Sequence, residues 1–139
     1  MAGRSLPARP GGVQFTQSER ADITRILSDP AYGVGTRAAH FMRQYGHRLT
    51  FSVRAKLIYV LMAGFVGQDK NRFTVPLKRI AGWADCTPRS AQRAIRELTR
   101  SGPLPLLLET PGRPGKVSEY RLVHDPFTVA AQQAADAER

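Results

Sequence analysis

The chain has 139 residues, of which 42% are hydrophobic, and it carries a formal net charge of +10. This length predicts one domain, or one small domain with appendages, and the apolar content argues against wholesale disorder. The single cysteine, Cys86, excludes an internal disulfide and a cysteine-based zinc cluster.

The positive charge is unevenly distributed along the chain. Residues 54–121 hold 13 lysines and arginines against 5 acids, whereas residues 122–139 have a net charge of −2. An excess of this kind favours nucleic acid or an anionic membrane surface as partner. The longest apolar run, Leu57 to Gly67, is well below the roughly 20 residues that cross a bilayer. We therefore expect no membrane association, no secretory signal, and a cytoplasmic, nucleoid-associated protein.

The first segment, residues 1–13, is rich in glycine, proline and arginine and is predicted to be a flexible basic arm. Such an arm either reaches phosphates or a minor groove, or is an ordinary disordered terminus. Residues 14–48 form a predicted N-terminal helical extension, with helices over 14–27 and 36–45. Thr16 and Glu19 have the spacing of a capping box. The pair of helices packs on the main domain or supplies a dimer interface, and the sequence does not separate the two.

A third helix is predicted from Val53 to Val66, capped by Ser52 and followed by a polar turn at Gln68–Asn71. Its broad apolar surface identifies it as a central core helix. The predicted core positions are Ala55, Leu57, Ile58, Leu61, Met62 and Phe65. Residues 72–75 are expected to form a short strand.

Two further helices follow, joined by a tight turn. The first starts with Pro76 in its first turn, has Trp83 as a partly buried anchor, and ends before the turn at residues 85–87. Its expected buried stripe is Leu77, Ile80, Ala81 and Ala84. The second helix covers 88–101, with Thr87 as N-cap and Pro88 at its first position.

This second helix has two opposite faces. Its apolar residues recur at helical spacing and are expected to face the core: Ala91, Ala94, Ile95 and Leu98. Its arginines lie in one narrow sector on the other side: Arg89, Arg93, Arg96 and Arg100. A stripe of four guanidinium groups suits an anion such as DNA, and the alternative is a solvated helix face.

A β-hairpin is predicted after the helix pair, with strands over 104–109 and 117–123 joined by a basic loop at 110–117. Pro105 implies that the first strand is an edge strand or starts late. The tail, residues 125–139, adds one helix or remains mobile.

Residues 49–123 resemble the winged helix-turn-helix domains of bacterial, plasmid and phage regulators and replication proteins, and the predicted domain covers residues 49–124. The resemblance is carried by Ala55–Tyr59, by Phe73–Ala81 and by Arg89–Leu98. It implies a mainly α protein with a small β-hairpin (α+β), with extra N-terminal helices before a DNA-binding domain.

By this resemblance, helix 88–101 enters the major groove and the loop at 110–117 contacts the backbone or the minor groove. The implied base contacts are Arg89, Ser90, Gln92 and Arg93. The implied phosphate contacts are Thr74, Lys78, Arg79, Thr87, Arg96 and Arg100, and the implied wing contacts are Arg113 and Lys116.

The function expected from these features is sequence-specific binding of double-stranded DNA by a transcriptional regulator. A homodimer is compatible with this function. The alternative is a winged-helix subunit of a larger nucleoprotein complex, or a plasmid or phage replication initiator. Catalysis is not expected, because His40, His47 and His124 are far apart in the sequence and no glycine-rich phosphate loop occurs. For the same reasons we expect no metal and no cofactor.

Overall fold

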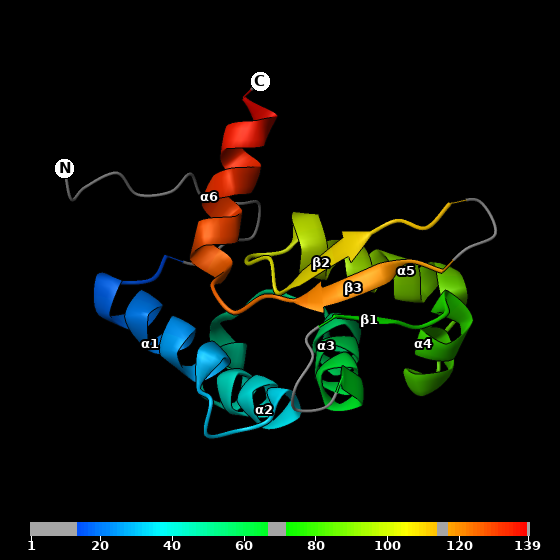
Figure 1. Ribbon diagram of the computed structural model, residues 1–139, viewed down its shortest axis with the longest axis horizontal. Helices are drawn as coiled ribbons and strands as arrows, with labels where there is room; N and C mark the ends of the chain where they lie inside the picture. Colours follow the sequence, from blue (N-terminus) through cyan, green and yellow to red (C-terminus); the bar gives the residue numbers. More distant parts are fainter. Residues whose placement is uncertain (1–13, 67–71, 114–116, 139) are drawn as a thin grey trace.

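The computed structural model describes residues 14–66, 72–113 and 117–138. This part of the chain is mainly helical, with one small antiparallel sheet (Figure 1). In chain order the elements are α1 (Gln17–Ser28), α2 (Val34–Tyr45), η1 (Gly46–Arg48), α3 (Val53–Val66), β1 (Arg72–Thr74), α4 (Leu77–Trp83), α5 (Pro88–Arg96), η2 (Glu97–Ser101), β2 (Leu107–Thr110), β3 (Glu119–Leu122) and α6 (Pro126–Ala137). The α+β prediction is thus confirmed. The basic arm at 1–13, the turn at 68–71 and Lys116 lie outside the described residues.

Of the two N-terminal helices, α1 packs on α2, and α2 packs on α3. The predicted capping box is present, since the Thr16 side chain accepts from the Glu19 N–H and the Glu19 carboxylate accepts from the Thr16 N–H. Helix α2 starts at Val34, two residues earlier than predicted. The two helices approach closely here, because a Cβ on Gly35 would lie 3.1 Å from Cα of Gly64 on α3 and would require a small shift of one helix. The extension is therefore joined to the rest of the fold by a tight helix–helix contact.

Helix α3 is central, but the prediction that Leu57 and Phe65 belong to the core is wrong. Ser52 caps it as predicted, and its hydroxyl accepts from the Ala55 N–H at 3.1 Å. The positions buried on α3 are Ala55, Ile58, Tyr59, Met62 and Ala63. Leu57 and Phe65 are instead 43% and 45% exposed. Helix α3 contacts α2, α4 and α5, and these neighbours leave a sector of it uncovered.

The sheet has the strand order β1-β3-β2, and β3 pairs antiparallel with both neighbours. Tyr120 and Leu122 of β3 are buried, while Glu119 and Arg121 alternate with them on the other face. The predicted start of β2 at Leu104 is wrong, since the strand begins at Leu107, after the buried Pro105. The expectation that Pro105 marks an edge strand or a late start is confirmed on both counts.

The tail forms a helix, which is one of the two alternatives that the sequence left open. Asp125 caps α6 by accepting from the Thr128 N–H at 3.2 Å. Within α6 only Pro126 is buried, and Figure 1 shows the helix projecting from the body. Phe127 nevertheless packs its ring against Phe15, with 5.9 Å between ring centroids. The first turn of α6 is therefore held to the body near α1.

Candidate nucleic-acid interface

The turn between α4 and α5 sets the direction in which α5 leaves the core. Cys86 N–H donates to Ala81 O at 3.0 Å and Asp85 N–H donates to Gly82 O at 3.3 Å, which is a Schellman motif. Asp85 takes the left-handed conformation that this motif requires, with φ of 51°. Aspartate tolerates this region better than most residues other than glycine. The turn is therefore closed by backbone hydrogen bonds, as a fixed join between two helices needs.

The start of α5 follows the sequence prediction. The Thr87 side chain accepts from the Ser90 N–H at 3.1 Å, and Pro88 occupies the first turn. The Thr87 hydroxyl also donates to the Ser90 hydroxyl at 3.1 Å. Both hydroxyls are thus engaged in the cap, although Thr87 was predicted to contact phosphate and Ser90 a base. Each hydroxyl oxygen still has acceptor capacity to offer a ligand.

The two faces of α5 are separated as predicted. The apolar face is buried and consists of Ala91, Ala94, Ile95 and Leu98. The opposite face is exposed and consists of Arg89, Gln92, Arg93, Arg96 and Arg100. Among the described residues, the guanidinium groups of Arg89, Arg93 and Arg96 make no hydrogen bond or ion pair. Three cations on one helix face are therefore without an internal counter-charge.

The acid that follows Arg96 in the sequence, Glu97, binds another part of the molecule. Its carboxylate accepts from the Ser52 N–H at 2.8 Å and from the Ser52 hydroxyl at 2.7 Å. Ser52 is the residue that caps α3, so Glu97 connects the end of the arginine-bearing helix to the start of the core helix. The connection orients the end of α5, and it engages the Glu97 carboxylate with Ser52.

Replacing Glu97 with alanine is expected to lower the free energy of unfolding by about 2 kcal/mol. Two hydrogen bonds to a charged acceptor are lost, and each contributes roughly 1.5–3 kcal/mol in less exposed settings. Glu97→Gln keeps an acceptor for the Ser52 N–H and should cost less than half as much. Urea unfolding of both variants measures the difference, and equal stability of Glu97→Ala and the unmodified chain would contradict the proposed connection.

The remaining predicted contact residues lie on three other elements. Lys78 and Arg79 are exposed on α4, and Thr74 is exposed at the end of β1. Arg113 is exposed in the hairpin that follows β2, whereas Lys116 lies outside the described residues. The helix pair and the hairpin thus each present exposed basic side chains.

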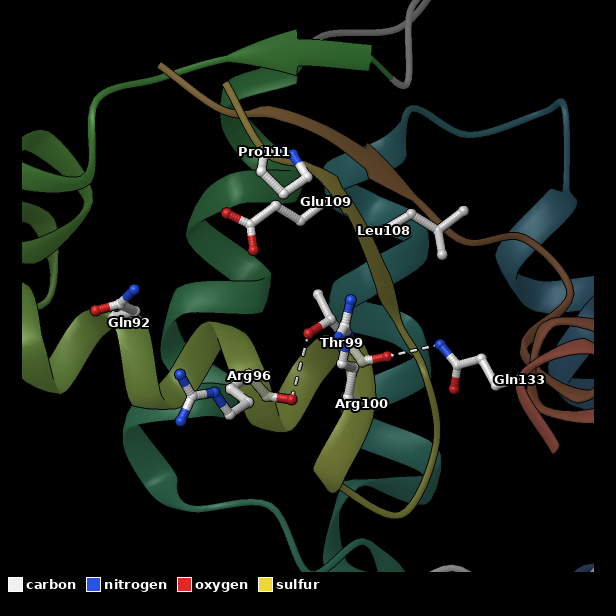
Figure 2. A pocket seen from close by; sticks show the side chains of 8 residues that line it. All are labelled: Gln92, Arg96, Thr99, Arg100, Leu108, Glu109, Pro111 and Gln133. Carbon is white, nitrogen blue, oxygen red and sulfur yellow. Dashed lines mark hydrogen bonds between the residues drawn. The ribbon is translucent and has the colours of Figure 1, made fainter. Parts of the chain in front are cut away.

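A polar pocket of about 310 Å³ is bordered by four elements (Figure 2). The end of α5 and η2 form one side, and β2 and α6 form the others. Its lining residues are Gln92, Arg96, Thr99, Arg100, Leu108, Glu109, Pro111 and Gln133. Three of the predicted contacts are brought together here, namely Gln92, Arg96 and Arg100. Sequence reasoning missed Glu109 and Gln133, because nothing in a strand residue or an alanine-rich tail indicates that either packs beside an arginine-bearing helix.

Among the described residues that line this pocket, Glu109 is the one acid. It is the cross-strand partner of Tyr120. Burial, reinforced by the nearby Glu109 charge, raises the pKa of Tyr120 to about 12. The Tyr120 phenol therefore loses its proton at a higher pH than an ordinary tyrosine, and Glu109 is the acidic side chain on the β2 side of the pocket.

The described residues do not form a metal site or a membrane-spanning helix. There is no group of three or more histidine, cysteine, aspartate or glutamate side chains placed to hold a metal ion among them. His124 is used in packing, with its Nδ1 atom 3.0 Å from Leu27 O. No helix in the described ranges is long and apolar enough to cross a membrane.

Comparison with protein-family models, with curated proteins and with solved structures gives no match.

Proposed function

We propose that this protein binds double-stranded DNA sequence-specifically as a winged helix-turn-helix protein, and that it regulates transcription. The observation on which the proposal rests is the exposed stripe of Arg89, Arg93 and Arg96, which has no internal counter-charge among the described residues. Unpaired arginines on a rigidly oriented helix are suited to phosphates and to guanine edges.

The arrangement of elements supports the same proposal. A helix pair joined by a tight turn is followed by a hairpin whose second strand lies between β1 and β2. In this proposal α5 and η2 enter the major groove, which admits an α-helix. The hairpin loop at 110–117 then contacts the backbone or the adjacent minor groove.

The start of α5 is assigned to base reading and its end to the backbone. Arg89, Gln92 and Arg93 are exposed near the start, where a recognition helix contacts base edges. Arg96 and Arg100 lie towards the end and are assigned to phosphates, together with Lys78 and Arg79 on α4. Phosphate contacts set the register, and base contacts supply the sequence preference. A homodimer on a two-fold site would extend the sequence that is read.

A fluorescence-anisotropy titration of the full chain with a random-sequence duplex, at several salt concentrations, tests DNA binding directly. Four cations on phosphates, Lys78, Arg79, Arg96 and Arg100, predict a log–log salt slope of roughly −3.6, at about 0.9 per contact. No binding at low salt would refute the proposal. Selecting bound fragments from host DNA then identifies the preferred sequence and separates a promoter site from a replication origin.

A further inference from the structure

Helix α6 contributes one side chain to the pocket beside the arginine stripe. Gln133 Nε2 donates to Thr99 O at 2.8 Å, and these residues are 34 positions apart in the chain. Figure 2 shows Gln133 reaching from α6 towards Thr99, with Glu109 and Pro111 on the β2 side of the same pocket. The tail is thus bound to η2, which carries Arg100 and directly follows Arg96 at the end of α5.

The acceptor of this hydrogen bond is in an irregular turn. Residues Glu97–Ser101 form a π-helical segment, in which the hydrogen-bonding pattern of α5 changes. Thr99 is buried there, and its hydroxyl donates to Arg96 O at 3.3 Å. Gln133 therefore holds the last turn of the helix at the point where Arg96 and Arg100 line one pocket.

The pocket lining is positively charged. The described lining residues include two guanidinium groups, those of Arg96 and Arg100, against one carboxylate, that of Glu109, and the amides of Gln92 and Gln133 add polar groups. An acceptor-rich anion satisfies such a lining better than a neutral or cationic group does. The volume of about 310 Å³ accommodates a phosphate together with part of its sugar.

We propose that this pocket binds a phosphodiester group of the bound DNA, and that α6 is thereby part of the nucleic-acid surface. Arg96 and Arg100 supply the charge, and Gln133 positions the turn between them. The inference rests on the proposed DNA binding and adds to it an element outside the helix pair and hairpin.

The first test compares two glutamines on the same helix. Gln133→Glu places a negative charge in the pocket and replaces the donor to Thr99 O with an acceptor. Gln132→Glu makes the same charge change at an exposed position, where the side chain bonds to Asp136 instead. Anisotropy titrations of the full chain with the selected duplex should show at least fivefold weaker binding for Gln133→Glu than for Gln132→Glu. The salt slope of Gln133→Glu should also be about 0.9 shallower, for one lost phosphate contact.

A second pair of variants predicts a gain of affinity, which poor folding cannot imitate. Glu109→Gln removes the negative charge from the pocket, and Glu119→Gln removes one from the next strand, where Glu119 pairs with Thr110. Glu109→Gln should bind the duplex at least threefold more tightly than Glu119→Gln does.

The outcomes distinguish the inference from the function on which it rests. Equal effects within both pairs, with normal duplex binding by the unmodified chain, would overturn the pocket alone. Failure of the unmodified chain to bind duplex would overturn both. Inorganic phosphate tests whether the pocket binds the phosphate group itself. If phosphate displaces the duplex only at concentrations that act equally on the unmodified chain and on Gln133→Glu, the competition is general ionic screening, and this result counts against the pocket.

Discussion

Replacing Arg89 and Arg93 together with alanine is expected to weaken binding to the preferred duplex by roughly 100-fold or more. A good arginine–guanine pair contributes roughly 1–3 kcal/mol of discrimination, and about 1.4 kcal/mol corresponds to a factor of ten. Both side chains are exposed on α5 and make no internal ion pair among the described residues, so their removal leaves no buried charge behind. The loss should therefore come from the complex and not from the free protein.

The informative quantity is the ratio of the affinities for preferred and random duplex. If these arginines read bases, the double variant loses much more affinity for the preferred duplex than for the random one. The control is Arg43→Ala, which removes from α2 an exposed positive charge that likewise makes no ion pair among the described residues. The control should alter both affinities by a similar, small factor. Equal losses on both duplexes for the Arg89 and Arg93 variant would instead assign these side chains to phosphates.

The separation of α5 into two faces was predictable because it depends on local geometry. Side chains three and four residues apart lie on one side of any helix, so the spacing of Ala91, Ala94 and Ile95 is sufficient to identify the buried face. The cap at Thr87 and the position of Pro88 are local in the same way. The cap is formed by hydrogen bonds between residues three positions apart, so the sequence alone is sufficient to place the start of the helix.

Contacts between distant residues were not predictable. Ser52 and Glu97 are 45 positions apart, and Thr99 and Gln133 are 34 apart. Nothing in their local sequences indicates the pairing, because it arises only when α3, η2 and α6 pack together. The exposure of Leu57 has the same origin, since apolar spacing marks a face of α3 but does not say how much of that face the neighbouring helices cover.

Gly102→Ala is expected to have the largest effect on stability, lowering the free energy of unfolding by about 3 kcal/mol. A Cβ at this position would lie 2.3 Å from Glu97 O and 2.4 Å from Cε1 of the buried Phe51. The backbone of Gly102 is extended, with φ of −84°, so other residues can adopt its conformation and the cost is steric. Relief of the clash requires a shift of the π-helical segment or of the Phe51 ring.

The matched control is Gly82→Ala on α4, where an added Cβ meets no atom within 4 Å. Alanine is the better helix former by about 1 kcal/mol, so this variant should be slightly more stable than the unmodified chain. Thermal unfolding should show a midpoint roughly 10 °C lower for Gly102→Ala and unchanged or higher for Gly82→Ala. If Gly102→Ala unfolds at the normal temperature, Phe51 and Glu97 are not packed against Gly102 in solution. The backbone of Glu97 would then lie elsewhere, and its carboxylate would not be held against Ser52 to orient the arginine stripe.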